Sequence, residues 1–258
     1  MPSPSVIRIT ELDLNNVPPK SIDDKNGSKI AVIGKPGSGK SFLIRDLMYA
    51  KKHIIPVAMG LSGTEDSNGF LSEMLPSSFV HENLDLSALS SFVQRQKIAK
   101  YYLADTNPWA LVIVDDCMEN PNQMRRPLIQ SIFKNGRHWK LMLLLGLQYA
   151  MDILPAVRIC IDGTFIFREP NHKFRKTIWE NYASIIPDFK LFCQIMDEIT
   201  DDHTALYVDN TSKSNKLEDC VFWFRARTIP EDFTFGCDDY WYFHEDRYDE
   251  DVGQKRFQ

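Results

Sequence analysis

A glycine-rich stretch near the amino terminus constrains the fold of this chain more than any other feature. Residues 33–41 read IGKPGSGKS, in which two glycines bracket four residues and a lysine and a serine follow. An apolar run over 29–33 precedes the stretch, and residues 41–52 read as a helix. Gly34 and Gly39 permit backbone angles and close approaches that a Cβ would block. A loop of this kind between a strand and a helix predicts an α/β fold with an anion site at the start of the helix.

The chemistry of this loop indicates a nucleoside triphosphate. Its backbone amides and the positive end of the following helix would form a nest for phosphate oxygens. Lys40 would reach the β- and γ-phosphates, and the hydroxyl of Ser41 would ligate Mg²⁺. The residues that we expect to bind the nucleotide are Gly34, Lys35, Pro36, Gly37, Ser38, Gly39, Lys40, Ser41 and Phe42.

Length and composition set broad limits on the architecture. A chain of 258 residues suits one large α/β domain with extensions, or two small domains. The longest strongly apolar run, 141–147, is far shorter than the ~18 residues of a membrane span, so we expect none. The first residues lack a basic segment followed by an apolar one, so no secretion signal is expected. Five scattered cysteines without a C-x-x-C pair favour free thiols.

Charge is distributed unevenly along the chain. The formal net charge is −5, which counts mildly against a nucleic-acid partner. Residues 237–258 carry seven acidic and three basic side chains, so the remainder is close to neutral. This acidic, aromatic-rich end would lie away from any DNA path, dock on a partner, or simply form a solvated terminus.

Strand and helix patterns alternate along the chain. We expect strands over 6–12, 29–33, 53–60, 77–84, 111–114, 141–147, 163–169, 204–210 and 219–227, and helices over 41–52, 86–102, 123–134, 171–183 and 187–199. Pro56 suits an edge strand or the end of a strand. The pattern predicts a mostly parallel central β-sheet flanked by helices, with its site at the carboxyl ends of the strands. We expect the chain to consist of an N-terminal strand and linker over 1–27, a core domain over 28–228, and an acidic, aromatic-rich tail over 229–258.

Polar residues follow two of the apolar strands, where a site would need them. Asp115 ends the strand LVIV and could enter the coordination shell of Mg²⁺. Asp116 would orient or deprotonate an attacking water. Gln148 ends the strand over 141–147 and could sense the γ-phosphate, hold the water or cap the next helix. Arg137, just before that strand, is either a surface cation or an arginine that stabilises charge on a neighbouring subunit's nucleotide.

Four segments together resemble a known family. GKPGSGKS, IVDDC, NGRHWKLMLLLGLQ and LPAVRICIDGTFIF are similar to segments of the genome-packaging ATPases of large nucleocytoplasmic DNA viruses, which belong to the FtsK/HerA class of P-loop motors. The resemblance covers roughly residues 28–228, and its most specific part is GRH about ten residues before a glutamine that ends a strand. It implies a RecA-like P-loop NTPase fold, assembled as a homo-oligomeric ring.

The resemblance also implies an activity and roles for residues. The ring would hydrolyse ATP with Mg²⁺ and drive double-stranded DNA, independently of its sequence, into a preformed capsid. Lys40 and Ser41 match the Walker A residues, Asp115 the metal-binding Walker B acid, and Asp116 the catalytic acid, which is usually a glutamate in the wider class. Gln148 matches the polar sensor, and Arg137 the arginine acting in trans, with Arg158 as a second candidate. The partners would be DNA and a capsid or portal component, at a cytoplasmic virus assembly site or in the virion.

Contacts with DNA are poorly specified by the sequence. Translocation along any sequence needs phosphate contacts rather than base readout, so lysines and arginines of loops are the expected groups. Arg125, Arg126, Lys173, Arg175 and Lys176 are candidates, and each also fits a solvated basic turn.

Three other functions remain open. A GTPase-like switch would read guanine through N-K-x-D, and the nearest string, NKLE at 215–218, ends in glutamate. A small-molecule kinase would need an acceptor pocket, and the strand-end acids fit a hydrolase better. In a capsid-associated structural protein the nucleotide site would be vestigial. The intact Lys40, Ser41 and paired aspartates argue against this function.

Overall fold

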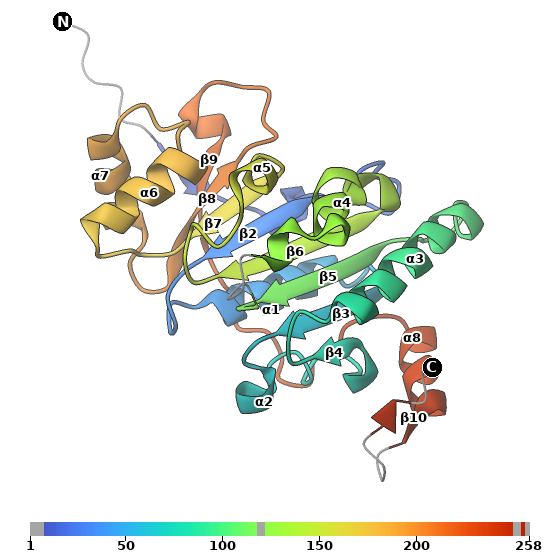
Figure 1. The fold of residues 1–258 in the computed structure, drawn as a ribbon. Coiled ribbons are helices and arrows are strands. Elements are labelled where there is room, and N and C mark those ends of the chain that lie inside the picture. Colours follow the sequence, from blue (N-terminus) through green and yellow to red (C-terminus); the bar gives the residue numbers. More distant parts are fainter. Residues whose placement is uncertain (1–7, 118–121, 250–253, 256–258) are drawn as a thin grey trace, which may run out of the picture.

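The computed structural model describes residues 8–117, 122–249 and 254–255. Its main feature is one nine-stranded sheet in the order β1-β9-β8-β7-β2-β6-β5-β3-β4 (Figure 1). The strands are β1 Thr10–Glu11, β2 Lys29–Ile33, β3 Val57–Ser62, β4 Val80–His81, β5 Ala110–Asp115, β6 Leu141–Leu147, β7 Gly163–Ile166, β8 Thr204–Asp209 and β9 Val221–Arg225. A separate two-stranded pair joins β10 Tyr248–Asp249 to β11 Gln254–Lys255.

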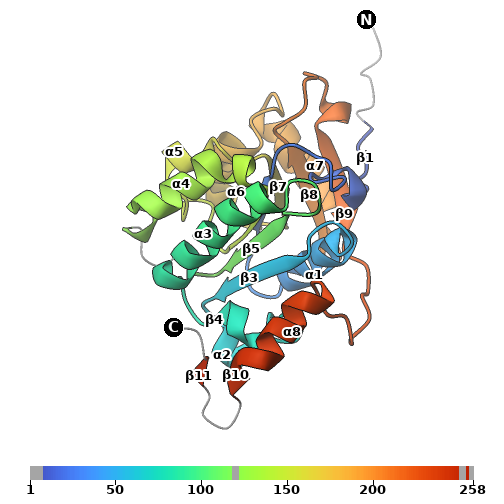
Figure 2. The same ribbon diagram turned by 90° about the vertical axis from the view of Figure 1, so that its right-hand side faces the viewer.

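Helices cover both faces of this sheet. They are α1 Lys40–Lys51, α2 Glu65–Asn68, α3 Leu86–Tyr102, α4 Pro127–Asn135, α5 Pro155–Arg158, α6 His172–Tyr182, α7 Phe189–Ile199 and α8 Asp238–Arg247. Apolar side chains of α3, α4, α6 and α7 pack on one face, while α1 packs on the other (Figures 1 and 2). Short 3-10 turns are η1 Leu14–Asn16, η2 Ser77–Phe79, η3 Gln123–Arg125, η4 Gly136–Trp139 and η5 Leu217–Asp219.

The central strands are buried on both sides, which explains their unbroken apolar sequences. Every residue of β2, β5 and β6 is buried. All three run parallel, and β6 lies between β2 and β5. A parallel sheet covered on both faces selects such strands, so the predicted mostly parallel sheet flanked by helices is confirmed. The last strands depart from parallel pairing, because β8 is antiparallel to both β7 and β9.

The strand that follows Pro56 is not an edge strand, which was one of the two positions that this proline suggested. β3 begins at Val57, directly after Pro56, and lies between β5 and the two-residue strand β4. The proline marks the beginning of the strand and not an edge, because an imino acid before the first paired residue removes no ladder hydrogen bond. The strand expected over 77–84 is reduced to a 3-10 turn and β4.

Part of the predicted tail, 229–258, packs on the sheet and its helices. Phe235 is fully buried, and its N–H donates to the carbonyl of Met74 at 2.8 Å. The Tyr240 hydroxyl donates to the carbonyl of Ala58 at 2.6 Å. Helix α8 therefore stands beside β4 and α2 (Figure 2), with its acidic side chains exposed. Among the described residues, no helix combines the length and apolar character that crossing a membrane requires.

Candidate nucleotide-binding site

The glycine-rich loop leaves the central strand β2 and turns directly into α1. Gly37 and Gly39 have φ of +77° and +109°, a region that side chains with a Cβ rarely adopt. Lys40 is the first residue of the helix and is buried, with its Nζ donating to the carbonyl of Gly34 at 2.9 Å. The amides that start α1 and the ammonium group thus converge on one small volume, as a phosphate site requires.

The two acids that follow the apolar strand β5 lie beside this loop. Asp115 is buried at the carboxyl end of the strand. Space for its side chain comes from Gly146 on the neighbouring strand, where a Cβ would lie 1.7 Å from Asp115 Oδ1. Sequence reasoning missed Gly146, although a lone glycine in an apolar strand is a known sign of close approach by another group.

Asp116 turns toward the end of β6. Its φ of +50° is unusual for a residue with a side chain, and it changes the direction of the chain directly after the strand. The Asp116 Oδ2 atom accepts a hydrogen bond from Gln148 Nε2 at 2.8 Å and lies 3.7 Å from Lys40 Nζ. The structure therefore brings Lys40, Asp115, Asp116 and Gln148 together from three strand ends.

The oxygens of this site fit a magnesium ion. Ser38 Oγ, Asp115 Oδ1 and Asp116 Oδ1 are buried and have no hydrogen-bond partner among the described residues. Burial, and next the charge of Asp116, raise the pKa of Asp115 to about 6. A divalent cation would satisfy such oxygens and remove the cost of two adjacent carboxylates. Mg²⁺ usually takes one or two carboxylates and completes its shell with phosphate and water oxygens.

An open cleft extends from the loop along the end of the sheet. Its volume is about 640 Å³, and its lining includes every loop residue from 35 to 42 except Ser38. On the far side the lining consists of residues 225–228, together with His203. The ring nitrogen Nδ1 of His203 lies 3.1 Å from the carbonyl oxygen of Ser38. This far wall could not be predicted from a local pattern, because it joins the loop to residues more than 160 positions away.

Two further acids fix the surroundings of the loop. Glu169, buried just beyond β7, accepts from Lys35 Nζ at 2.8 Å and so tethers a loop side chain. Asp46 of α1 is fully buried and binds the Arg227 guanidinium, with Nη2 at 2.7 Å from Oδ1. A buried carboxylate with several donors is well satisfied. Glu169 follows an apolar strand, and an acid at that position is a sequence sign of a site residue.

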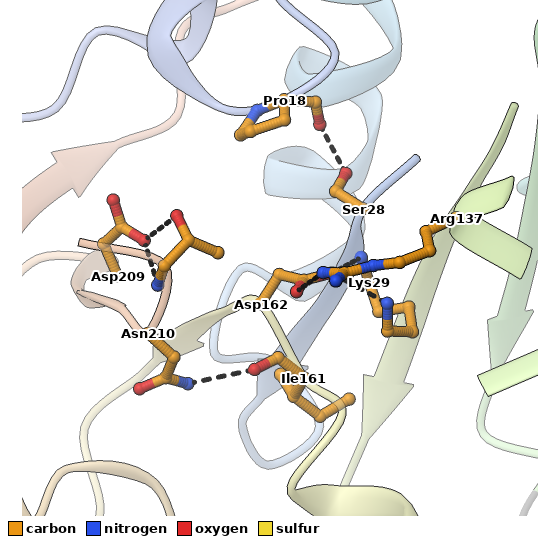
Figure 3. A network of polar contacts seen from close by, with 9 residues as sticks. Pro18, Ser28, Lys29, Arg137, Ile161, Asp162, Asp209 and Asn210 are labelled. Atoms are coloured by element: carbon orange, nitrogen blue, oxygen red, sulfur yellow. Dashed lines mark hydrogen bonds and ion pairs between the residues drawn. The ribbon is translucent and has the colours of Figure 1, made fainter. Parts of the chain in front are cut away.

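The two arginines suggested for action in trans lie away from this cleft. Arg137 comes before β6, at the amino ends of the parallel strands, and its Nη2 lies 3.0 Å from Asp162 Oδ1. Asp162 also accepts from Lys29 Nζ at 2.9 Å, and Figure 3 shows both cations converging on it. Arg158 is buried, donates to Asn181 and to the carbonyl of Ile153, and stacks on Tyr182. A role of either arginine stays a prediction.

The loop cations suggested for DNA differ in accessibility. Arg175 is buried, and its guanidinium binds Asp197 Oδ1 at 2.6 Å and the carbonyl of Glu169. The expectation that Arg175 lies at the surface is wrong, because its ion pair with Asp197 joins α6 to α7. Arg125, Arg126, Lys173 and Lys176 are exposed.

A RecA-like P-loop NTPase is the class that this sheet, loop and set of strand-end acids define. Solved structures of the class have the same fold. The genome packaging NTPase B204 from Sulfolobus turreted icosahedral virus 2, in complex with AMPPCP, is 16% identical with a TM-score of 0.54, and the match covers 78% of this chain and 98% of that one. The conjugation coupling protein TcpA of pCW3, with ATPgS, is 12% identical with a TM-score of 0.53, over 86% and 64% of the chains.

The chain belongs to a family of proteins from large DNA viruses. Uncharacterized protein 088R of Invertebrate iridescent virus 3 is 48% identical over 239 residues, which cover 91% of each chain. Uncharacterized protein 015R of Frog virus 3 is 38% identical, over 91% of this chain and 72% of that one. No family model matches the sequence. The viral source of these relatives and the fold shared with B204 confirm the resemblance to packaging ATPases of such viruses.

Proposed function

We propose that the chain is an ATP-driven motor that moves double-stranded viral DNA into a preformed capsid. The observation that carries this proposal is the convergence of Lys40, Asp115, Asp116 and Gln148 on one cleft. The fold shared with a viral genome packaging NTPase, and relatives that come from large DNA viruses, support the same conclusion. ATP is the substrate, and Mg²⁺ is the cofactor that the site would take.

Each group of the site has a distinct task in hydrolysis. The loop amides and Lys40 bind the β- and γ-phosphates. Ser41 and Asp115 would hold Mg²⁺, which when bound offsets negative charge on those phosphates. Asp116 accepts a proton from the attacking water or orients it. Gln148 fixes the direction of the Asp116 carboxylate through their hydrogen bond of 2.8 Å.

A ring follows from the need for an arginine at the γ-phosphate. Arg137 lies at the amino ends of the strands, so within one subunit it cannot reach the cleft at their carboxyl ends. A strand of seven residues such as β6 spans about 23 Å. In a homo-oligomeric ring Arg137 of one subunit would serve its neighbour's nucleotide. Binding of DNA would be independent of sequence, and a capsid or portal component would complete the assembly.

The alternatives gain no support from the site. Residues 215–218, the nearest string to a guanine-reading motif, lie in the connection between β8 and β9 and are not among those that line the cleft. If GTP were hydrolysed as well as ATP, a switch function would be favoured. If phosphate were transferred to a metabolite, a kinase would be favoured.

Steady-state ATP hydrolysis with and without linear double-stranded DNA tests the proposal. The rate should rise with DNA at ~50 mM salt and rise less at ~200 mM, because phosphate contacts weaken steeply between these concentrations. Lys40→Ala should abolish hydrolysis, and Arg137→Ala should abolish it without removing ATP binding. A rate that ignores DNA at both salt concentrations, in a sample that sizing shows to be assembled, would contradict the proposal.

A further inference from the structure

Two segments of this acidic chain contain no acidic residue. Residues 86–103 and 122–151 together hold eight lysines and arginines and no aspartate or glutamate. The rest of the chain therefore has a formal charge of −13 within a total of −5. Such a separation concentrates positive potential wherever the fold brings the two segments together.

The fold does bring them together on one face. The segments form α3 and α4, which pack side by side on the same side of the sheet (Figure 2). Their carboxyl ends are joined through Trp139, because Lys97 Nζ lies 4.5 Å from the centre of the indole ring and Gln96 Nε2 donates to the Trp139 carbonyl at 2.7 Å. We define the α3–α4 basic surface as five of the exposed cations on these helices and on the turn before α4: Lys97, Lys100, Arg125, Arg126 and Lys134.

No acidic side chain of the described residues forms an ion pair with these cations. None of the five has a carboxylate within 4.0 Å among residues 8–117, 122–249 and 254–255. Tyr101 and Tyr102 follow Lys100 at the end of α3 and are 78% and 76% exposed. Lysine, arginine and tyrosine are the side chains that bind phosphate oxygens of DNA without reading bases.

The helix dipole explains the positions of only some of these cations. Lys100 and Lys134 lie in the last turns of their helices, where a cation is favoured by the helix dipole. That preference does not explain Arg125 and Arg126, which come before α4, where a cation is disfavoured. Nor does it explain why both segments lack every acidic residue.

We infer that the α3–α4 basic surface holds the phosphate backbone of double-stranded DNA. This rests on the proposed function and names the face of the motor on which its substrate lies. Exposed lysines on flexible stems suit a substrate of any sequence, since they act as point charges. Arg125 follows Asp115 by ten residues along the chain, so the surface begins close in sequence to the strand end that carries the two acids.

Binding of a fluorescent 30-base-pair duplex of mixed sequence, measured by anisotropy at ~50, 100 and 200 mM NaCl, tests the inference. The variant Lys97→Gln/Lys100→Gln/Lys134→Gln removes three charges from the surface. The matched control Lys190→Gln/Lys213→Gln/Lys216→Gln removes three exposed charges elsewhere. The midpoint of thermal unfolding monitors the fold of both.

The surface variant should bind at least ~10-fold more weakly at 100 mM, and its slope of log K against log salt should be shallower by about 2 to 3. The control should change affinity by less than about 3-fold. Equal losses in both variants, or no loss in the first, would overturn the inference and leave the proposed function standing.

Two other outcomes separate the remaining possibilities. A wild-type protein that hydrolyses ATP but neither binds DNA nor responds to it overturns the proposed function together with the inference. A surface variant that binds DNA normally but no longer assembles, as judged by sizing, would assign the surface to the acidic helix α8 of a second copy, and would also overturn the inference.

Discussion

At the scale of single residues, the position of Asp115 depends on a glycine. A Cβ on residue 146 would lie 1.7 Å from Asp115 Oδ1 and 2.8 Å from its Cγ, so the carboxylate would have to shift. Gly146→Ala should therefore displace the carboxylate that would hold Mg²⁺ and lower kcat for ATP hydrolysis by about 100-fold. Nucleotide binding, measured by calorimetry, should persist because the loop is untouched.

Gly136→Ala is the matched control for this change. Its added Cβ would meet nothing nearer than 3.6 Å, at Leu141 Cδ2. The control should hydrolyse ATP at the wild-type rate. Wild-type turnover by Gly146→Ala would mean that Asp115 has no role in catalysis.

We expect Gln148 to act in hydrolysis by orienting the carboxylate of Asp116. Gln148 Nε2 holds Asp116 Oδ2 at 2.8 Å, on a residue whose backbone has a φ of +50°. Gln148→Ala should lower kcat by roughly 10- to 100-fold, since the acid loses its orientation, with little change in KM. Gln194→Ala, at an exposed position on α7, should change neither. If Gln148→Ala altered only KM, Gln148 would contact substrate and not position the acid.

At the scale of elements, helix α1 is fixed to η1 by a buried lysine. Lys51 is 1% exposed, and its Nζ donates to the carbonyl of Leu14 at 2.8 Å. Burial lowers the pKa of Lys51 from 10.5 to about 8. Between these values the unfolded chain binds more protons than the folded one, so this lysine makes the free energy of unfolding rise with pH.

The comparison with Lys51→Met isolates this effect. The unfolding free energy of the wild type minus that of the variant should increase by about 1.5 kcal/mol from pH 8 to pH 9.5. Urea titrations at each pH measure it, and all other titrating groups cancel in the difference. A constant difference for Lys51→Met across this pH range would show that Lys51 is not desolvated.

Elements with strong local patterns could be predicted from the sequence. Residues 86–102 form α3 and residues 141–147 form β6 as expected, because apolar spacing and burial agree there. The loop and the acids of β5 could be found because a phosphate site needs few residues at fixed spacing. Gly146 and Glu169 carry local signals, a lone glycine in an apolar strand and an acid after one, but only the fold shows what they contact. His203 carries no such signal, because its contact with the loop joins segments that are distant in the chain. The same holds for the tail predicted over 229–258, since only the fold shows that Phe235 is buried.

At the scale of the whole molecule, the residues that we propose to act in hydrolysis lie at both ends of the sheet. The cleft lies at the carboxyl ends of the strands, whereas Arg137 and Asp162 lie at the amino ends. In a ring, a subunit with Arg137→Ala retains an intact loop, and one with Lys40→Ala retains an intact arginine. Mixing the two inactive variants should restore up to about a quarter of wild-type ATP hydrolysis, because an intact loop then meets an intact arginine. Mixed samples as inactive as each variant alone would contradict action of Arg137 in trans.

Displacement of a third strand measures whether the proposed motor moves along DNA. A labelled oligonucleotide paired as a triplex on linear double-stranded DNA is released only by a protein that travels through it. The wild type should release the label with ATP and Mg²⁺, and neither Lys40→Ala nor a non-hydrolysable analogue should support release. ATP hydrolysis that DNA stimulates, without release of the third strand, would contradict translocation and leave only a DNA-responsive ATPase.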